Sequence, residues 1–254
     1  MKYVEIARGI PNNRGIIIPV NTLGDYINKD PLYRSVYLYD ETAVEYVSEH
    51  GSLRNFFGIR YIDKIPIDID KQENTDEKTL DILRSVILEL EDAEIDCGSF
   101  QSYFSGSGYH LILSGELFNF KAGNDLPYIV KQTLKKLVPH LDSSIYMRTG
   151  IYRVQHTLNK KTNLFKVPLT RDEVMNLDAS DILEIAKGNR ADFKYHPLKA
   201  DGELEETIIT DVPDIQMFNK ISEPNKVVPC VQSMLKQGAI EGNRHVTAMR
   251  IISH

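Results

Sequence analysis

The sequence has no tryptophan and only two cysteines, Cys97 and Cys230, among its 254 residues. Neither cysteine stands in a CxxC or Cys/His spacing, so cysteine supports neither a disulfide framework nor a structural zinc site. No apolar run reaches the roughly 20 residues that span a bilayer, and the first residues lack the apolar block of a secretory signal. We therefore expect a globular protein of the cytoplasm without a membrane partner.

The chain is acidic overall, with one basic stretch. A net charge of −6 argues against a coat of positive charge over the whole surface. Between residues 131 and 171, however, nine basic residues stand against a single acid, Asp142. The nine are Lys131, Lys135, Lys136, Arg148, Arg153, Lys160, Lys161, Lys166 and Arg171. Such a local excess predicts an anionic partner.

Apolar periodicity predicts two helices. Asn74 is expected to cap the first, with Glu77 in the capping-box position. Its apolar stripe is Leu80, Leu83, Ile87 and Leu90. The second is expected over 126–137, with Asn124 as cap, Pro127 in the first turn, and Ile129, Val130, Leu134 and Leu137 facing inward.

Extended segments are predicted between and around these helices. Runs rich in β-branched and aromatic residues predict strands over 35–39 and 57–70. Residues 98–116 predict two strands joined by a Gly/Ser turn at Gly106–Gly108, and 144–158 and 163–169 predict further extended chain. The order of elements indicates an α+β fold with a mainly antiparallel sheet.

The remainder changes in character after Arg171. Residues 171–188 predict short helices, with Asp178 or Ser180 as a cap, and complete a core over 1–188. Residues 189–226 are polar with scattered prolines, which predicts a linker or arm. Residues 227–254 predict the start of a helical domain that stops at His254 without a cap. We expect the chain to be cut inside a larger protein.

Asp68 and Asp70 are two like charges separated by one isoleucine in an apolar run. In a strand they share a face. Two carboxylates this close repel each other unless a cation lies between them or solvent screens them. A divalent cation and a solvated edge strand both explain the pair.

Two further motifs carry candidate chemistry. In "SGSGYH", residues 105–110, glycines would let backbone N–H groups approach a phosphate, while hydroxyls and His110 donate to it. In "YRVQHTLNKKTNLFK", cationic side chains could meet a polyphosphate. The alternative for the first motif is an ordinary hairpin turn followed by a packed or solvated histidine. The alternative for the second motif is a basic hairpin on the surface. The candidate side chains in this second motif are Arg153, His156, Lys160, Lys161 and Lys166.

Together these features satisfy one chemical requirement. Nucleotidyl transfer uses two divalent cations held by carboxylates, and cationic groups around the triphosphate. Asp142 would supply a third carboxylate, although a solvating charge after a helix explains it as well. Oxygen ligands suit Mg or Mn rather than Zn.

The motifs resemble those of the archaeo-eukaryotic primase superfamily, and within it the primase-polymerases of phages and mobile elements. "PIDID" resembles the first motif, with its two metal-binding acids, and "SGSGYH" is similar to the second. Asp142, Tyr146 and Arg153 match the third in residue type and spacing, and Lys166 in "LFKVPL" resembles the basic strand that follows. Many members carry serine two residues before the histidine, where this chain has Gly108. The resemblance covers about residues 30–175.

The resemblance implies an RRM-like antiparallel sheet with flanking helices and an N-terminal α/β unit. It implies a DNA primase-polymerase that extends from NTP or dNTP on a single-stranded DNA template. Two Mg or Mn ions would be held by Asp68, Asp70 and Asp142. The nucleotide would contact Ser105, Ser107, Gly108, His110, Arg153 and Lys166. The final segment resembles the helical domain that follows such cores, often with a helicase domain or subunit beyond it.

Three other functions fit parts of the pattern. A repair enzyme of the same superfamily would extend primers rather than start them. A non-catalytic DNA-binding replication initiator module would use only the basic block, and its acids would be solvated. A metal-dependent nuclease would use similar carboxylates but would need no triphosphate-binding turn.

Overall fold

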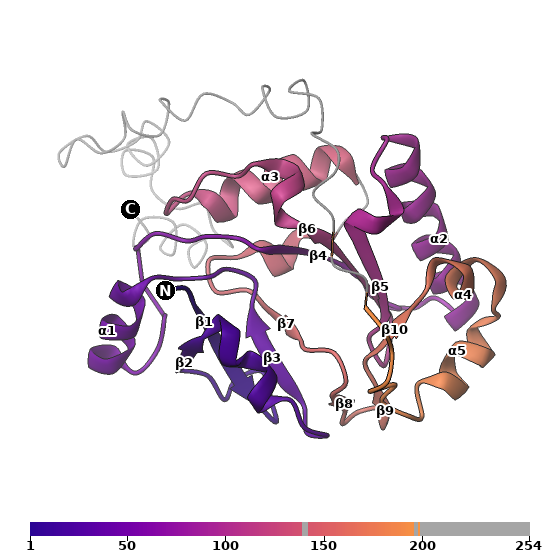
Figure 1. The fold of residues 1–254 in the computed structure, drawn as a ribbon, viewed down its shortest axis with the longest axis horizontal. Helices are drawn as coiled ribbons and strands as arrows, with labels where there is room; N and C mark the ends of the chain where they lie inside the picture. The colour runs from indigo at the N-terminus through magenta and orange to yellow at the C-terminus, as the bar shows by residue number, and fades with distance from the viewer. Residues whose placement is uncertain (139–141, 196–197, 199–254) are drawn as a thin grey trace, which may run out of the picture. The chain divides into compact units, whose positions relative to one another are not determined.

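The computed structural model describes residues 1–138, 142–195 and 198, which belong to one compact unit spanning Met1–Asp211 (Figure 1). The predicted domain at 227–254 and most of the predicted linker lie outside the described residues. Two four-stranded antiparallel sheets and five α-helices make up this part of the chain. The fold is therefore α+β, as the sequence predicted.

The first sheet is N-terminal except for one strand. Its order is β2 (Ile16–Pro19), β1 (Tyr3–Arg8), β3 (Leu32–Ser35) and β7 (Ile151–Arg153). Helix α1 (Glu41–His50) follows β3 and is capped by the Asp40 side chain. Because β7 pairs with β3 across more than 100 residues of chain, this sheet brings Arg153 opposite Tyr33.

The second sheet carries the first two predicted motifs. Its order is β10 (Val167–Leu169), β5 (Phe100–Phe104), β6 (Tyr109–Ser114) and β4 (Lys64–Ile69). Chain order β4–α2–β5 with β6 inserted between the two strands is a split β-α-β unit. Strand β4 ends this sheet within the described part of the chain, so the Asp68 side chain lies at a sheet edge.

Helix α2 (Asp76–Asp92) packs on β4 and β6 and forms much of the core. The predicted stripe is confirmed, since Leu80, Leu83, Ile87 and Leu90 are all fully buried. The predicted cap was wrong by one residue. The Thr75 hydroxyl, not Asn74, accepts a hydrogen bond from the Lys78 N–H, and no capping box forms here.

Helix α3 (Leu126–Leu137) has the predicted bounds and the predicted early proline. Its cap residue is Asp125 rather than Asn124. Val130 and Leu134 are fully buried, whereas Ile129 and Leu137 are half-buried. The helix therefore has a narrower buried face than predicted.

Short elements complete the described chain. They are the 3₁₀ helices η1 (Val20–Tyr26), η2 (Cys97–Ser99), η3 (Gly115–Phe118) and η4 (Ser143–Tyr146), the strand pair β8 (Leu158–Asn159) and β9 (Leu164–Phe165), and helices α4 (Arg171–Asn176) and α5 (Ala179–Ile185). Asp178 caps α5, which was one of the two predicted caps. No helix in the described part of the chain is both long and apolar enough to cross a membrane.

Two predicted strands differ from those observed. Instead of one strand over 57–70, only Lys64–Ile69 forms β4. Residues before it are shaped by Arg60, whose fully buried guanidinium donates to the backbone carbonyls of Phe56, Gly58 and Arg148. The predicted strand at 35–39 is also largely absent from this described segment. Strand β3 ends at Ser35, and Leu38 and Tyr39 take part in isolated β-bridges instead of a strand.

The start of the predicted linker contacts the core. Arg190 forms an ion pair with Glu173 of α4, with Nη2 and Oε1 2.9 Å apart. The Tyr195 hydroxyl lies 2.7 Å from Nε2 of His156, and His156 Nδ1 lies 2.6 Å from the Asn189 carbonyl oxygen. Residues 189–195 are therefore tied to the β7–β10 region.

Candidate active site

Asp68 and His110 lie directly opposite each other in the β4–β6 ladder. Oδ1 of Asp68 is 3.2 Å from Nε2 of His110, and the carboxylate is about a quarter exposed. Asp70 follows the last residue of β4 and is exposed. The pairing therefore joins the first predicted motif to the end of the second.

The Ser/Gly turn between β5 and β6 packs closely against the backbone at Asp70. A Cβ on Gly108 would lie 2.4 Å from the Ile69 carbonyl oxygen, so no side chain fits there. Gly106 has φ +93°, a conformation that favours glycine. The close approach at Gly108 and the positive φ at Gly106 explain why both positions of the turn are glycine.

The two serines of the turn have different surroundings. Ser105 is buried, and its hydroxyl accepts a hydrogen bond from the Gly108 N–H at 3.2 Å. Ser107 is exposed, and its hydroxyl has no hydrogen-bond partner within the described part of the chain. Ser107 is therefore the serine whose hydroxyl is available to a ligand.

Lys166 lies behind His110 and fixes its ring. Its Nζ is 2.7 Å from Nδ1 of His110 and donates to the Arg153 carbonyl oxygen at 2.8 Å. Because the ionised Asp68 carboxylate can only accept, Nε2 of His110 carries the proton directed at it, and the unprotonated Nδ1 accepts from the Lys166 amine. Burial, together with Lys166 and against the attraction of Asp68, lowers the pKa of His110. Burial and Arg153 hold the pKa of Lys166 well below its usual range.

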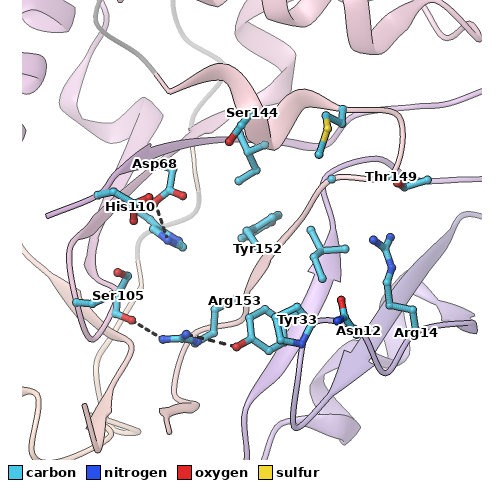
Figure 2. A pocket seen from close by; sticks show the side chains of 17 residues that line it. Asn12, Arg14, Tyr33, Asp68, Ser105, His110, Ser144, Thr149, Tyr152 and Arg153 are labelled. Carbon is cyan, nitrogen blue, oxygen red and sulfur yellow. Dashed lines mark hydrogen bonds and ion pairs between the residues drawn. The ribbon is translucent and has the colours of Figure 1, made fainter. Parts of the chain in front are cut away.

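Arg153 connects the two sheets at this site (Figure 2). Its Nη1 donates to the Ser105 carbonyl oxygen at 2.6 Å, and Nη2 donates to the Tyr33 hydroxyl at 3.4 Å. Its Nε is buried without a partner within the described part of the chain. The guanidinium is therefore held at the base of the Ser/Gly turn.

A cavity of about 390 Å³ opens where these groups meet. Its lining comes from the β4 end, the Ser/Gly turn, β3, the segment 144–150, β7 and the β1–β2 connection (Figure 2). Its polar lining residues are Asn12, Arg14, Tyr33, Asp68, Asp70, Ser105, Ser107, His110, Ser144, Thr149, Tyr152 and Arg153. The volume is in the range of small-molecule sites.

Asp142 lies at a second cavity, of about 590 Å³, which Asp68 and Asp70 also line. Asp142 is exposed, and its Oδ1 accepts from the Ser144 N–H at 2.8 Å as the cap of η4. The structure thus places all three predicted carboxylates around one opening between β4 and α2. The Ser/Gly turn lies on the other side of Asp68 and Asp70.

The carboxylates repel one another. The negative charge of Asp68, then partial burial and Asp142, raise the pKa of Asp70. Burial would raise the pKa of Asp68 as well, but His110, Lys166 and Arg153 outweigh it and lower that pKa. A cation between Asp68 and Asp70 would remove the repulsion that Asp70 experiences.

The donor set suits a hard divalent cation. Within the described residues, no three His, Cys, Asp or Glu side chains already converge as a ligand set. The repulsion at Asp70 is nevertheless a feature that Mg or Mn would relieve, and the available donors are carboxylate oxygens. Asp68, Asp70 and Asp142 are the candidate donors for such an ion.

Not every member of the predicted basic block offers free positive charge at the surface. Lys166 is buried, Arg171 pairs with Glu91 of α2, and only Arg153 and Lys166 of the nine reach the site network. The expectation that residues 131–171 meet an anionic partner stays a prediction. Sequence separation does not determine which of these side chains share a face.

Sequence reasoning missed the wall of the cavity contributed by the first sheet. Tyr33 reaches Arg153 through the β3–β7 pairing, and Asn12 and Arg14 come from the connection between β1 and β2. No local motif marks these residues. The pairing of distant strands was the missing information.

Comparison with protein-family models and with curated proteins finds no match to this chain.

Proposed function

We propose that this chain is the catalytic core of a DNA primase-polymerase, which joins NTP or dNTP to a growing strand on a single-stranded DNA template. The observation that carries the proposal is one cavity lined by Asp68, Asp70, the Ser105–Gly108 turn, His110 and Arg153. A carboxylate pair alone fits many metal sites. A carboxylate pair beside a glycine-rich turn and two cationic or donor groups fits a metal-bound triphosphate.

Each residue has a role in this proposal. Asp68, Asp70 and Asp142 would hold the divalent ions, whose chemistry would be to activate the attacking 3′-hydroxyl and neutralise the leaving pyrophosphate. Ser107 and the backbone N–H groups of the turn contact phosphate oxygens. Arg153 supplies positive charge to the triphosphate, and His110 orients Asp68 through Nε2–H. Lys166 holds His110 in the tautomer this requires.

The fold supports the proposal at the level of architecture. In this proposal the expected RRM-like sheet would be the four-stranded antiparallel sheet β10-β5-β6-β4, with Asp68 on its edge strand, Asp70 directly after that strand, and helix α2 packed on β4 and β6. The N-terminal sheet then forms the opposite wall of the nucleotide cavity. We place the enzyme in the cytoplasm, with a helicase domain or subunit as its partner.

The test supplies single-stranded DNA template, NTPs, dNTPs and Mg or Mn, with and without a labelled primer. Labelled product from template alone supports priming. Extension only of a supplied primer identifies the repair-type polymerase of the same superfamily. Shortened template identifies a nuclease, and template binding without either reaction identifies a DNA-binding initiator module.

Variants decide whether Asp68 and Asp70 carry the reaction. Asp70→Asn should lower nucleotide incorporation about 100-fold or more, because even residues that only orient metal ligands usually contribute 10- to 100-fold. Asp92→Asn is the matched control, since Asp92 is exposed at the end of α2. Equal incorporation by Asp70→Asn, Asp92→Asn and the wild type would remove the proposal.

A further inference from the structure

A third cavity, of about 440 Å³, adjoins the candidate active site. It shares Arg14 and Thr149 with the nucleotide cavity. In Figure 2 these two residues lie at the opposite end of that cavity from Asp68 and His110. The segment 147–149 borders both spaces, because Met147 lines the first and Arg148 lines the second. The two cavities are therefore neighbours on either side of Arg14 and Thr149.

This third cavity combines an exposed aromatic ring with free cations. Phe57 is 66% exposed, which is unusual for a phenylalanine, and the Arg148 guanidinium lies 4.9 Å from its ring centre. Arg54 also lines the cavity. Arg54 and Arg148 are exposed, and neither forms an ion pair within the described part of the chain.

The lining has an excess of positive charge. Four arginines stand against one acid, Glu5, and Glu5 is buried in an ion pair with Arg14. The excess has no counter-charge on the surface of the cavity. A polyanion is the partner that would supply it.

Arg60 holds this arrangement in place. Its guanidinium donates to the carbonyl oxygens of Phe56 at 2.8 Å and Gly58 at 2.9 Å, on either side of Phe57. It also donates to the Arg148 carbonyl oxygen at 3.2 Å. One buried side chain thus fastens the loop that carries Phe57 to the segment that carries Arg148. A preorganised ring and cation lose little entropy on binding a ligand.

We propose that this surface binds single-stranded nucleic acid, with a base stacked on Phe57 and phosphates contacted by Arg54 and Arg148. Aromatic rings beside cations are the usual means of holding single strands without reading their sequence. The assignment of this strand as the template entering the active site rests on the proposed function. The binding surface itself does not.

The test measures binding of a fluorescein-labelled oligothymidylate by anisotropy, without nucleotide and with EDTA. Phe57→Leu keeps an apolar side chain but removes the ring, and should weaken binding about 5- to 100-fold. Phe57→Tyr should bind as the wild type does. Ile59→Ala is the matched control, because Ile59 is 46% exposed two residues away and lies outside the cavity lining.

Salt dependence separates the two kinds of contact. Arg148→Gln should weaken binding and reduce the slope of log affinity against log salt by about 0.7, the value for one phosphate contact on a single strand. Phe57→Leu should leave that slope unchanged. A polyglutamate peptide should compete far less well than unlabelled oligothymidylate, and equal competition would mean that the surface recognises charge alone.

The outcomes distinguish this inference from the proposed function. If Phe57→Leu and Arg148→Gln bind the oligonucleotide as tightly as Ile59→Ala does, the inference is wrong even where Asp70→Asn abolishes incorporation. If both variants bind weakly and the wild type incorporates no nucleotide, the single-strand binding surface is supported and the proposed polymerase activity is wrong.

Discussion

Asp68 and His110 face each other across β4 and β6, with Oδ1 and Nε2 3.2 Å apart. The pairing brings a residue of the first motif, on β4, into contact with a residue of the second motif, on β6. Lys166 continues the chain of contacts on the far side of the imidazole, with Nζ 2.7 Å from Nδ1. The Asp68 carboxylate, the His110 imidazole and the buried Lys166 amine therefore contact one another in series. Of these three groups, only the carboxylate is appreciably exposed to solvent.

The first prediction concerns His110. His110→Gln should reduce nucleotide incorporation about 10- to 100-fold, the range for residues that orient a metal ligand. The glutamine amide can still donate toward Asp68, so His110→Ala should be the more severe variant. Steady-state incorporation at several metal concentrations measures the effect. A reduction that excess metal partly restores is expected, since the loss lies in how Asp68 is held.

The second prediction separates the function of Lys166 from its contribution to stability. The cost of burying its amine partly offsets the loss of its two hydrogen bonds, so Lys166→Met should lower the free energy of unfolding by no more than about 1–3 kcal/mol. Incorporation should nevertheless fall, because His110 loses the donor that fixes its tautomer. Urea denaturation and the incorporation assay together test this. A large loss of stability with unchanged specific activity would contradict it.

The third prediction concerns the tight turn at Gly108. Gly108→Ala should lower the free energy of unfolding by about 1–3 kcal/mol, because its Cβ would lie 2.4 Å from the Ile69 carbonyl oxygen. The adjustment should also displace the backbone at Asp70 and reduce incorporation. Gly24→Ala is the control, since a Cβ there meets nothing within 4 Å. Equal stability of the two variants would contradict the close approach.

The fourth prediction is a pH dependence of stability. Burial acts to raise the pKa of Glu173, but its bonds to Arg190 and Thr170 outweigh burial and lower that pKa below the ordinary 4.5. A lowered carboxyl pKa stabilises the fold above the ordinary value, and this contribution is lost as the pH falls through the folded pKa. The stability difference between wild type and Glu173→Gln should therefore shrink under acid conditions. Denaturation from neutral pH to below the ordinary Glu pKa measures it, and a constant difference would contradict the ion pair.

The sequence predicted local features well where one element determined them. The stripe of α2, the bounds of α3 and the β5–β6 hairpin all follow from spacing and turn residues that lie within a few positions of each other. The cap of α2 was missed because Asn74 and Thr75 are both good cap residues. Only backbone geometry decides between them.

The sequence did not predict features that depend on distant contacts. Arg60 turns residues 56–60 away from strand geometry by binding carbonyls from two segments. Tyr33 enters the site through β7, and the basic residues of 131–171 are distributed among α3, the core and the site by tertiary packing. The residue pattern marked Asp68, Asp70 and His110 as candidates, whereas no such pattern marks Asn12, Arg14 and Tyr33, which line the same cavity.

The last prediction tests the predicted face of α2. Leu83 is fully buried on the stripe, and Leu88 of the same helix is 49% exposed. Leu83→Ala should lower the free energy of unfolding by about 2–5 kcal/mol, because it removes buried methyl groups and leaves a cavity under β4 and β6. Leu88→Ala should change it by less than about 0.5 kcal/mol. Urea denaturation monitored by circular dichroism measures both, and similar losses for the two leucines would mean that the helix does not present this face to the sheet.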